Sequence, residues 1–189
     1  MTSQKLFQLE SWVSYSDLLE MKNQTLEEIE ECTLLTGTIK VTWGDFHHGW
    51  IPEVPEDKEC DDLTSLEWLD QWCHHLTNIA RLLKSDGYAA GTNLEGGRFL
   101  MEFRKINNNV FFRELGVETS SHIYSKQPVN STVLYSSLEP VKFDVFCNEI
   151  ADFIENLLNK AIAVVPHFKQ WSNFEKLKAS IVNLRQLNP

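Results

Sequence analysis

The sequence predicts an α+β domain, in which a mostly antiparallel sheet carries two large amphipathic helices on one face and a further helix follows at the C-terminus. Three observations predict this class. Segments of β-branched or alternating residues occur in both halves of the chain, two longer segments place apolar residues at three- and four-residue steps, and the order is strands, helix, strands, helices. Packing the helices on one face of antiparallel hairpins is the simplest arrangement of that order. A chain of 189 residues, 42% of them hydrophobic, can fill the core of one domain.

The N-terminal segments have mixed strand and helix character. Residues 6–13 (LFQLESWV) fit a strand or the start of a helix. Residues 16–31 have a helical composition, with Ser16 or Thr25 as candidate N-caps.

A β-branched segment at residues 34–43 (LLTGTIKVTW) predicts the next strand. The sequence WGDFHHG then links it to a second extended segment, Trp50–Val54. Because proline cannot donate a backbone hydrogen bond, Pro52 and Pro55 place this second segment at a sheet edge or a strand end.

The clearest helix of the first half is predicted over residues 61–87. Asp62 or Thr64 is the candidate N-cap, and Gly87 is the candidate end. One apolar stripe with helical spacing runs along it and consists of Leu66, Leu69, Trp72, Leu76, Ile79 and Leu83.

A β-hairpin is predicted from residues 98–106 and 110–115, joined by three asparagines that tolerate the left-handed turn conformation. One face of its first strand is expected to be buried, because Phe99, Met101 and Phe103 alternate with Arg98, Leu100, Glu102 and Arg104. Residues 132–138 (TVLYSSL) are a further candidate strand.

A long helix is predicted from about Pro140 to Val165, and Pro166 ends it. Its expected core side consists of Phe143, Phe146, Ile150, Phe153, Ile154, Leu157 and Leu158. Residues 168–187 predict a basic terminal helix. We therefore expect three parts: an N-terminal strand/helix extension (1–32), an α+β core domain (33–165), and a C-terminal basic helix packed on that core (166–189).

Charge is distributed unevenly along the chain, whose net charge is −10. Residues 1–80 carry 16 acidic and 4 basic side chains, net −12, whereas residues 81–189 carry 11 and 13, net +2. Residues 53–70 alone hold eight acids and one base. Such a negative field disfavours binding to nucleic acid or anionic membranes and attracts cationic partners.

Four of the six tryptophans flank this acidic stretch, and two of them, Trp50 and Trp68, lie off the predicted core positions. Tight protein interfaces combine aromatic anchors with a charged rim. The sequence therefore predicts a partner-binding surface, with Trp50 and Trp68 as anchors. Its expected acidic rim consists of Asp57, Glu59, Asp61, Asp62, Glu67 and Asp70.

A metal site is the competing interpretation of the same region, because His47, His48 and Cys60 lie within fourteen residues. Adjacent histidines point apart on a strand or a helix, however, whereas zinc needs three or four converging ligands. Cys73 and His74 likewise do not form a nucleophile pair, because adjacent residues on a helix point apart. The sequence also lacks a Gly-x-Ser-x-Gly motif and a phosphate-binding glycine loop. We expect a protein that is not an enzyme and holds no cofactor or metal.

The sequence also predicts the compartment. Its longest apolar run, Ala161–Val165, is far shorter than the roughly 20 residues that span a bilayer. Its N-terminus resembles no signal peptide. The four cysteines have irregular spacing and no CxxC, which is typical of reduced thiols. We expect a cytoplasmic monomer or homodimer with no membrane contact.

Short motifs give the chain a resemblance to a family of small uncharacterised bacterial proteins. A strand ends at "TW", "GW" follows, and after an amphipathic helix comes EGGRFLMEFRKINNNVFFREL. A closing helix and tail add Phe146, Trp171 and Phe174, so that the resemblance covers roughly residues 35–175. The family that the chain resembles is similar to families of immunity proteins, which neutralise toxins delivered by neighbouring bacteria. The resemblance implies no catalytic residues.

Three hypotheses follow. The first is a cytoplasmic immunity protein that binds and occludes a bacterial toxin, which the acidic field would attract quickly if the toxin is a basic nuclease. The second is a phage or plasmid anti-defence protein that acts as an acidic DNA mimic. The third is a small metal-dependent hydrolase that uses His47, His48 and Cys60.

Overall fold

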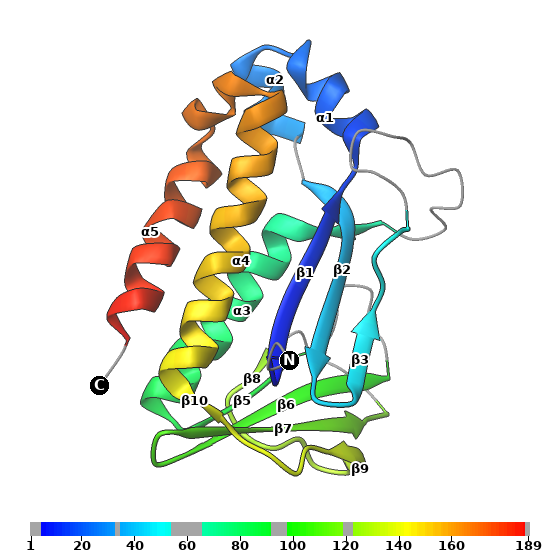
Figure 1. Cartoon of the computed structure of the whole chain (residues 1–189), viewed down its shortest axis with the longest axis vertical. Coiled ribbons are helices and arrows are strands. Elements are labelled where there is room, and N and C mark those ends of the chain that lie inside the picture. The colour runs from blue at the N-terminus through cyan, green and yellow to red at the C-terminus, as the bar shows by residue number, and fades with distance from the viewer. Residues whose placement is uncertain (1–4, 33–34, 54–65, 92–97, 119–122, 188–189) are drawn as a thin grey trace.

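The computed structural model describes residues 5–32, 35–53, 66–91, 98–118 and 123–187, which form an α+β fold with antiparallel sheets (Figure 1). The strands form two sheets, where the sequence predicted one. The first sheet has the order β1-β2-β3, with β4 paired to β2, and the second has the order β10-β7-β6-β5-β8, with β9 paired to β7. The first sheet contains β1 (Phe7–Val13), β2 (Thr36–Trp43), β3 (Phe46–Gly49) and β4 (Glu67–Trp68). The second contains β5 (Tyr88–Gly91), β6 (Phe99–Ile106), β7 (Asn109–Gly116), β8 (Ile123–Tyr124), β9 (Thr132–Ser136) and β10 (Val141–Lys142).

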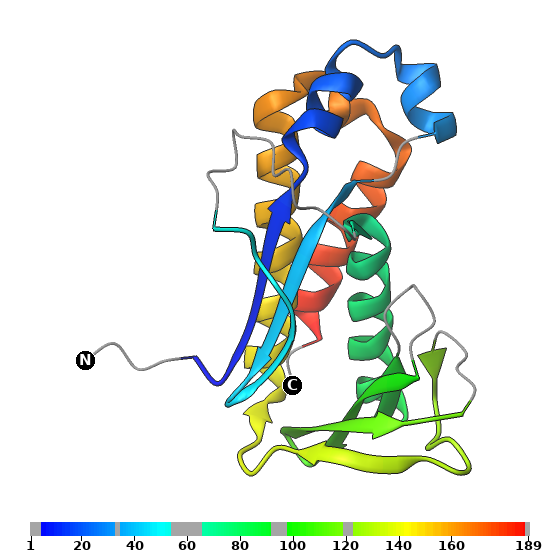
Figure 2. The ribbon, with the colours of Figure 1, turned by 90° about the vertical axis from the view of Figure 1, so that its right-hand side faces the viewer.

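The helices form two groups, three long ones beside the first sheet and two short ones at the end of the molecule. They are α1 (Tyr15–Lys22), α2 (Leu26–Cys32), α3 (Leu69–Ser85), α4 (Phe143–Val164), the 3₁₀ helix η1 (Pro166–Gln170) and α5 (Ser172–Gln186). Figures 1 and 2 show α3, α4 and α5 rising side by side from the second sheet, with the first sheet along one flank. The short helices α1 and α2 cover the end of the molecule opposite the second sheet. No helix in the described part of the chain is long and apolar enough to cross a membrane.

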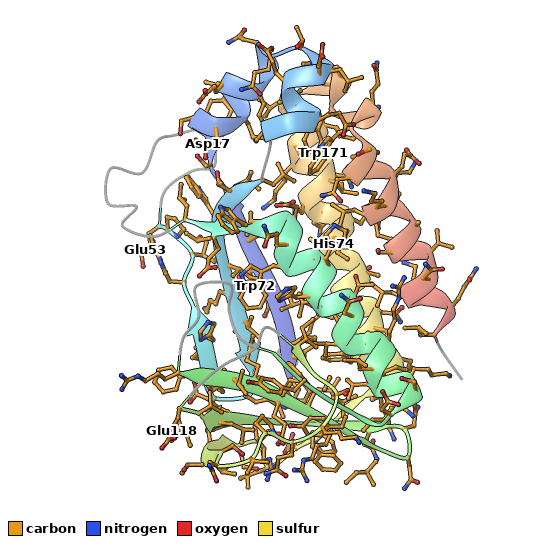
Figure 3. All side chains as sticks on the ribbon, turned by 180° about the vertical axis from the view of Figure 1, so that it is seen from behind. Asp17, Glu53, Trp72, His74, Glu118 and Trp171 are labelled. Carbon is orange, nitrogen blue, oxygen red and sulfur yellow. The ribbon has the colours of Figure 1, made fainter. Side chains whose placement is uncertain are left out.

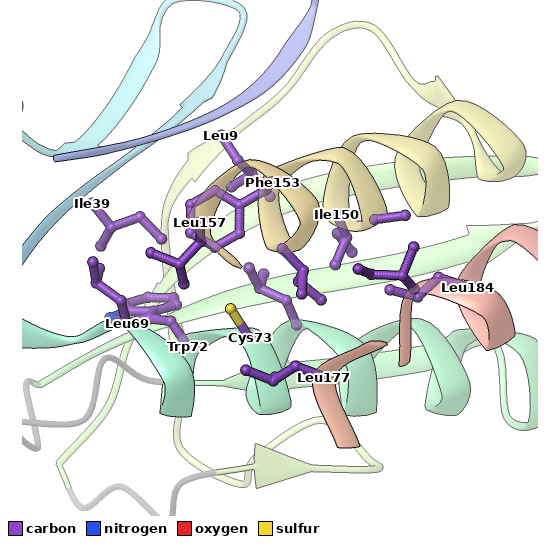
Figure 4. Packing of buried hydrophobic residues seen from close by; sticks show 14 of the residues in the cluster. Leu9, Ile39, Leu69, Trp72, Cys73, Ile150, Phe153, Leu157, Leu177 and Leu184 are labelled. Atoms are coloured by element: carbon purple, nitrogen blue, oxygen red, sulfur yellow. The ribbon is translucent and has the colours of Figure 1, made fainter. Parts of the chain in front are cut away.

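A single hydrophobic cluster joins both sheets to the three long helices. Trp43 lies at its centre, with its ring centroid 5.1 Å from that of Phe7, 5.5 Å from Phe112 and 6.2 Å from Phe146. These four rings come from β1, β2, β7 and α4. Figure 4 shows another part of the same cluster, where α3 and α4 pack against the first sheet and α5 packs on these two helices.

The N-terminal segment is built into this core. The strand β1 pairs with β2 along its whole length, from Phe7 opposite Trp43 to Val13 opposite Gly37. Side chains from α4 bind its other edge, where Glu149 accepts the N–H of Leu9 at 3.0 Å and Lys160 donates to the carbonyl of Ser11 at 2.9 Å. The strand β1 therefore shares one core with β2 and α4.

The two short helices begin at residues that cap them. Ser14, where the sequence suggested Ser16, accepts the N–H of Asp17 at the start of α1. Thr25 caps α2 as predicted, and Glu28 binds back to the N–H of Thr25 at 2.7 Å, which makes a reciprocal capping box.

Two element boundaries differ from the prediction around the candidate site. The histidines belong to a strand, because the chain turns at Gly44 (φ +57°) and Asp45 and pairs Phe46–Gly49 with β2. The helix α3 begins at Leu69, eight residues later than predicted. Glu67 and Trp68 pair with β2 and are held in extended conformation, so the helix cannot start before them. The candidate caps Asp62 and Thr64 lie outside the described residues.

The predicted hairpin is confirmed, but its buried face is partly wrong. The strands β6 and β7 pair from Phe99 opposite Gly116 to Ile106 opposite Asn109, and Asn107 has φ +55°. Phe99 is 53% exposed, whereas Leu100 and Glu102 on the opposite face are buried. That outer face has a small cluster of its own, formed by Leu100, Leu115 and Val117.

The C-terminal helices follow the prediction closely. All seven residues expected on the core side of α4 are buried. Pro166 starts a 3₁₀ turn after α4, and α5 then packs on α3 and α4 through Phe174, Leu177, Ile181 and Leu184.

Candidate partner-binding surface

Both predicted tryptophan anchors lie on one edge of β2. The N–H of Trp50 donates to the carbonyl of Ile39 at 3.1 Å, and Trp68 lies opposite Thr36. These partners are three residues apart on β2, which corresponds to about 10 Å along the strand. Trp50 is 39% exposed and Trp68 is 45% exposed. Two partly exposed indoles therefore lie along this edge.

Glu67 precedes Trp68 and is directed toward the helix. Its carboxylate accepts the indole N–H of Trp72 at 3.3 Å, and Trp72 itself is buried. The helix α3 is fixed at this end by the N–H of Leu69, which donates to the carbonyl of Leu35 at 2.6 Å. Glu67 thus lies beside the tryptophan edge while it also binds the core of α3.

Asp70 is not part of the surface, which corrects its assignment to the acidic rim. It is 3% exposed, because the start of α5 covers it. The amide of Asn173 donates to Asp70 Oδ2 at 3.2 Å, and Asn173 Oδ1 lies 2.8 Å from His74 Nε2. Burial raises the pKa of Asp70, although His74 and nearby backbone N–H groups oppose the shift.

Replacing Asp70 by asparagine should stabilise the protein at pH 7 by about 1 kcal/mol, because it removes a buried charge and keeps an oxygen that accepts the hydrogen bond of Asn173. The folded-state pKa is raised above the ordinary 3.8, so the wild type loses stability as pH rises from 3.8 through the folded-state value. The variant has no such loss, and its advantage should disappear below that range. Urea unfolding at several pH values measures the difference. Asp86→Asn, at an exposed site, is the matched control, and a less stable Asp70→Asn variant at pH 7 would contradict the prediction.

The other predicted rim residues, Asp57, Glu59, Asp61 and Asp62, lie outside the described residues. The described chain on one side of them ends at Glu53, which is exposed. Figure 3 shows Glu53 and Asp17 of α1 on the same side of the molecule.

The helices α1 and α2 add an acidic surface that was not predicted to belong to the site. Residues 15–32 contain six acids and one base. Asp17 accepts a hydrogen bond from Thr36, the residue opposite Trp68, so this acid is next to the tryptophan edge. Most of the others are exposed on α1 and α2: Glu20, Glu27, Glu28 and Glu30. The excess of acids in residues 15–32 is visible in the sequence. Their position next to Trp68 is not, because it depends on the pairing of β4 with β2.

The two histidines of β3 diverge. Thr42 Oγ1 lies 3.3 Å from His47 Nδ1 on one side of the sheet, whereas the ring of His48 lies 6.5 Å from that of Trp72 on the other side. Burial lowers the pKa of His48, against an opposing effect of Glu114. Cys60 lies outside the described residues. Within the described ranges, no group of three or more His, Cys, Asp or Glu side chains is placed to hold a metal ion.

The Cys73–His74 pair has separate environments, as the sequence predicted. Cys73 is fully buried, and burial raises the pKa of its thiol, which disfavours the reactive thiolate. His74 instead binds Asn173 of α5. Cys73 and Cys147 are both free, buried thiols.

A buried charge cluster on the outer face of the second sheet was not predicted. Glu102 has no exposed area, and it accepts hydrogen bonds from Arg113 Nε and, at 3.2 Å, from Arg104 Nη2. The hydroxyl of Tyr88 is buried nearby; burial and then the Glu102 charge raise the pKa of this phenol. The cluster lies on the second sheet, whereas the tryptophan edge belongs to the first.

Comparison with known proteins gives no relative: no protein-family model, curated protein or solved structure matches this chain.

Proposed function

We propose that this protein is a cytoplasmic immunity protein, which binds a cognate bacterial toxin and blocks its active surface. The proposal rests on one observation above all: two partly exposed tryptophans on a single edge of β2 bracket the most acidic segment of the chain. Aromatic anchors within a complementary charged rim are the arrangement from which tight protein interfaces draw their binding energy.

The acidic field favours a cationic partner. Nuclease toxins bind phosphates through basic residues, so an acidic protein surface can compete for the same residues. The acids of α1 and α2 extend this field beside Trp68, through the contact between Asp17 and Thr36. An inhibitor must bind before damage accumulates, and electrostatic attraction increases the association rate by about 10- to 1000-fold at low salt.

Charge reversal at Asp57, Glu59, Asp61 and Asp62 should abolish protection. The quadruple lysine variant should associate with the toxin at least about tenfold more slowly, because the steering field is removed. Candidate toxins are the products of genes adjacent to that of this protein, and survival of cells that co-express both proteins is the readout. Stopped-flow association kinetics then measure the rate.

The matched control carries the same change in net charge at exposed acids elsewhere in the sequence: Asp86, Glu118, Glu139 and Glu175. It should protect cells as the wild type does. Full protection by the Asp57/Glu59/Asp61/Asp62 variant would remove this cluster from the mechanism. If no neighbouring gene product is toxic and the protein instead inhibits a host nuclease, the DNA-mimic hypothesis replaces the immunity proposal.

A further inference from the structure

The strand β9 forms an apolar edge of the second sheet. It pairs with β7 on one side, and no strand in the described ranges pairs with its other side. Figures 1 and 2 show β9 at the end of the molecule opposite α1 and α2. Several large apolar side chains of this strand and its flanks are exposed: Val129 by 88%, Val133 by 46%, Leu134 by 51% and Leu138 by 96%.

The exposed edge is also free of charge. Residues 127–138 form the longest segment of the sequence without Asp, Glu, Lys or Arg, in a chain in which 23% of residues are charged. Edge strands of monomeric proteins are usually protected by charged side chains or prolines, which prevent pairing with another chain. The edge of β1 has such protection from Glu149 and Lys160, whereas β9 has no charged residue of its own.

The exposure of β9 does not result from loose packing. Tyr135 anchors the strand, with its ring 5.2 Å from Phe46 and 6.2 Å from Phe112. The register shifts next to it, because Val133 lies opposite Leu115 and Tyr135 lies opposite Glu114. Leu134 is the extra, bulged residue between them. It has no partner on β7, so it and Val133 are consecutive apolar side chains that are both about half exposed.

Electrostatics indicates which partner fits this edge. Two copies of a chain with net charge −10 repel each other, and bringing acidic surfaces together adds the cost of removing water from like charges. An uncharged apolar strip avoids the second cost and keeps the acidic surfaces of the two copies apart. A cationic partner, in contrast, gains nothing from a strip without acids.

We infer that two copies of this protein associate through β9, with the same strip of each copy in contact across a two-fold axis. The strip consists of Val129, Val133, Leu134 and Leu138. This interface lies at the opposite end of the molecule from the acidic helices α1 and α2. It is therefore separate from the acidic helices that extend the proposed toxin-binding surface.

Sedimentation velocity of the full chain over a range of concentrations tests this inference. The wild type should sediment as a dimer of the 21.9 kDa chain, and Leu134→Lys should weaken the dimer about tenfold or more. Leu138→Lys should weaken it too, and this side chain is too exposed for its replacement to unfold the protein. Because the interface is uncharged, high salt should leave the dimer intact or strengthen it.

Val182→Lys is the matched control, since Val182 on α5 is 54% exposed and lies on another surface. It should leave the dimer unchanged. A wild type that stays monomeric at all concentrations would overturn the inference. So would a dimer that both β9 variants leave intact, or one that Val182→Lys weakens equally. If the wild type is monomeric and Leu134→Lys instead loses protection against the toxin, the strip belongs to the toxin interface.

Discussion

Replacing Trp43 by alanine should lower the free energy of unfolding by about 3–5 kcal/mol, the range typical of large aromatic residues removed from a core. Trp43 has no exposed area, and its ring packs against Phe7, Phe112 and Phe146. Its indole N–H also donates to the carbonyl of Glu139 at 3.2 Å. The variant would leave a cavity where the two sheets meet α4. Because small domains have only about 5–15 kcal/mol of stability in total, much of it would be lost.

Urea unfolding followed by circular dichroism measures this loss. Trp68→Ala is the matched control, because it removes the same side chain from a site that is 45% exposed. It should cost about 1 kcal/mol or less. Equal losses for the two variants would contradict the central position of Trp43 in the core.

Replacing Glu102 by alanine should cost about 2–3 kcal/mol, because two partly exposed guanidinium groups lose the buried carboxylate that accepts their hydrogen bonds. Arg113 and Arg104 both donate to this carboxylate, which has no exposed area. Glu175→Ala is the control. Its carboxylate pairs with Lys178 at 3.2 Å in a solvent-exposed ion pair, so its loss should cost about 1 kcal/mol or less.

The same carboxylate should make the protein sensitive to acid. Burial alone would raise the pKa of Glu102, but hydrogen bonds and charge from Arg113 and Arg104 outweigh burial and hold the pKa below its ordinary 4.5. Its contribution to stability is therefore complete above pH 4.5 and is lost as the pH falls through the folded-state pKa. The stability difference between wild type and Glu102→Gln should shrink over that range. A difference that stays constant down to the acid transition would contradict the ion-pair assignment.

The sequence predicted elements whose signals are local. The α4 stripe and the β6–β7 hairpin are confirmed because their periodicity and turn residues lie within a single segment. The start of α3 was wrong because it depends on pairing between Trp68 and Thr36, which are 32 residues apart in the chain. No local pattern predicts that contact.

In the candidate surface, too, features with a local sequence signal were predictable and features that depend on distant residues were not. The partial exposure of Trp68 was predictable, because Trp68 lies off the apolar stripe of its own segment, and Trp50 lies outside any predicted stripe. The burial of Asp70 was not, because the residue that covers it, Asn173, lies 103 positions away. Glu102 looked like a solvent-facing position by alternation, but Arg113 of the next strand and Arg104 of its own strand satisfy its charge.

The hydrogen bonds between α4 and β1 have a consequence for biosynthesis. The N–H of Leu9 binds the carboxylate of Glu149, which is 140 residues further along the chain. The carbonyl of Ser11 binds the ammonium group of Lys160, which is 149 residues away, so neither bond can form until α4 has been synthesised. At ordinary translation rates, that interval lasts on the order of ten seconds. During it, the first strand has left the ribosome with its outer backbone uncovered. The outer edge of β1 is therefore completed only after α4 has been synthesised, and until then it is open to pairing with other chains.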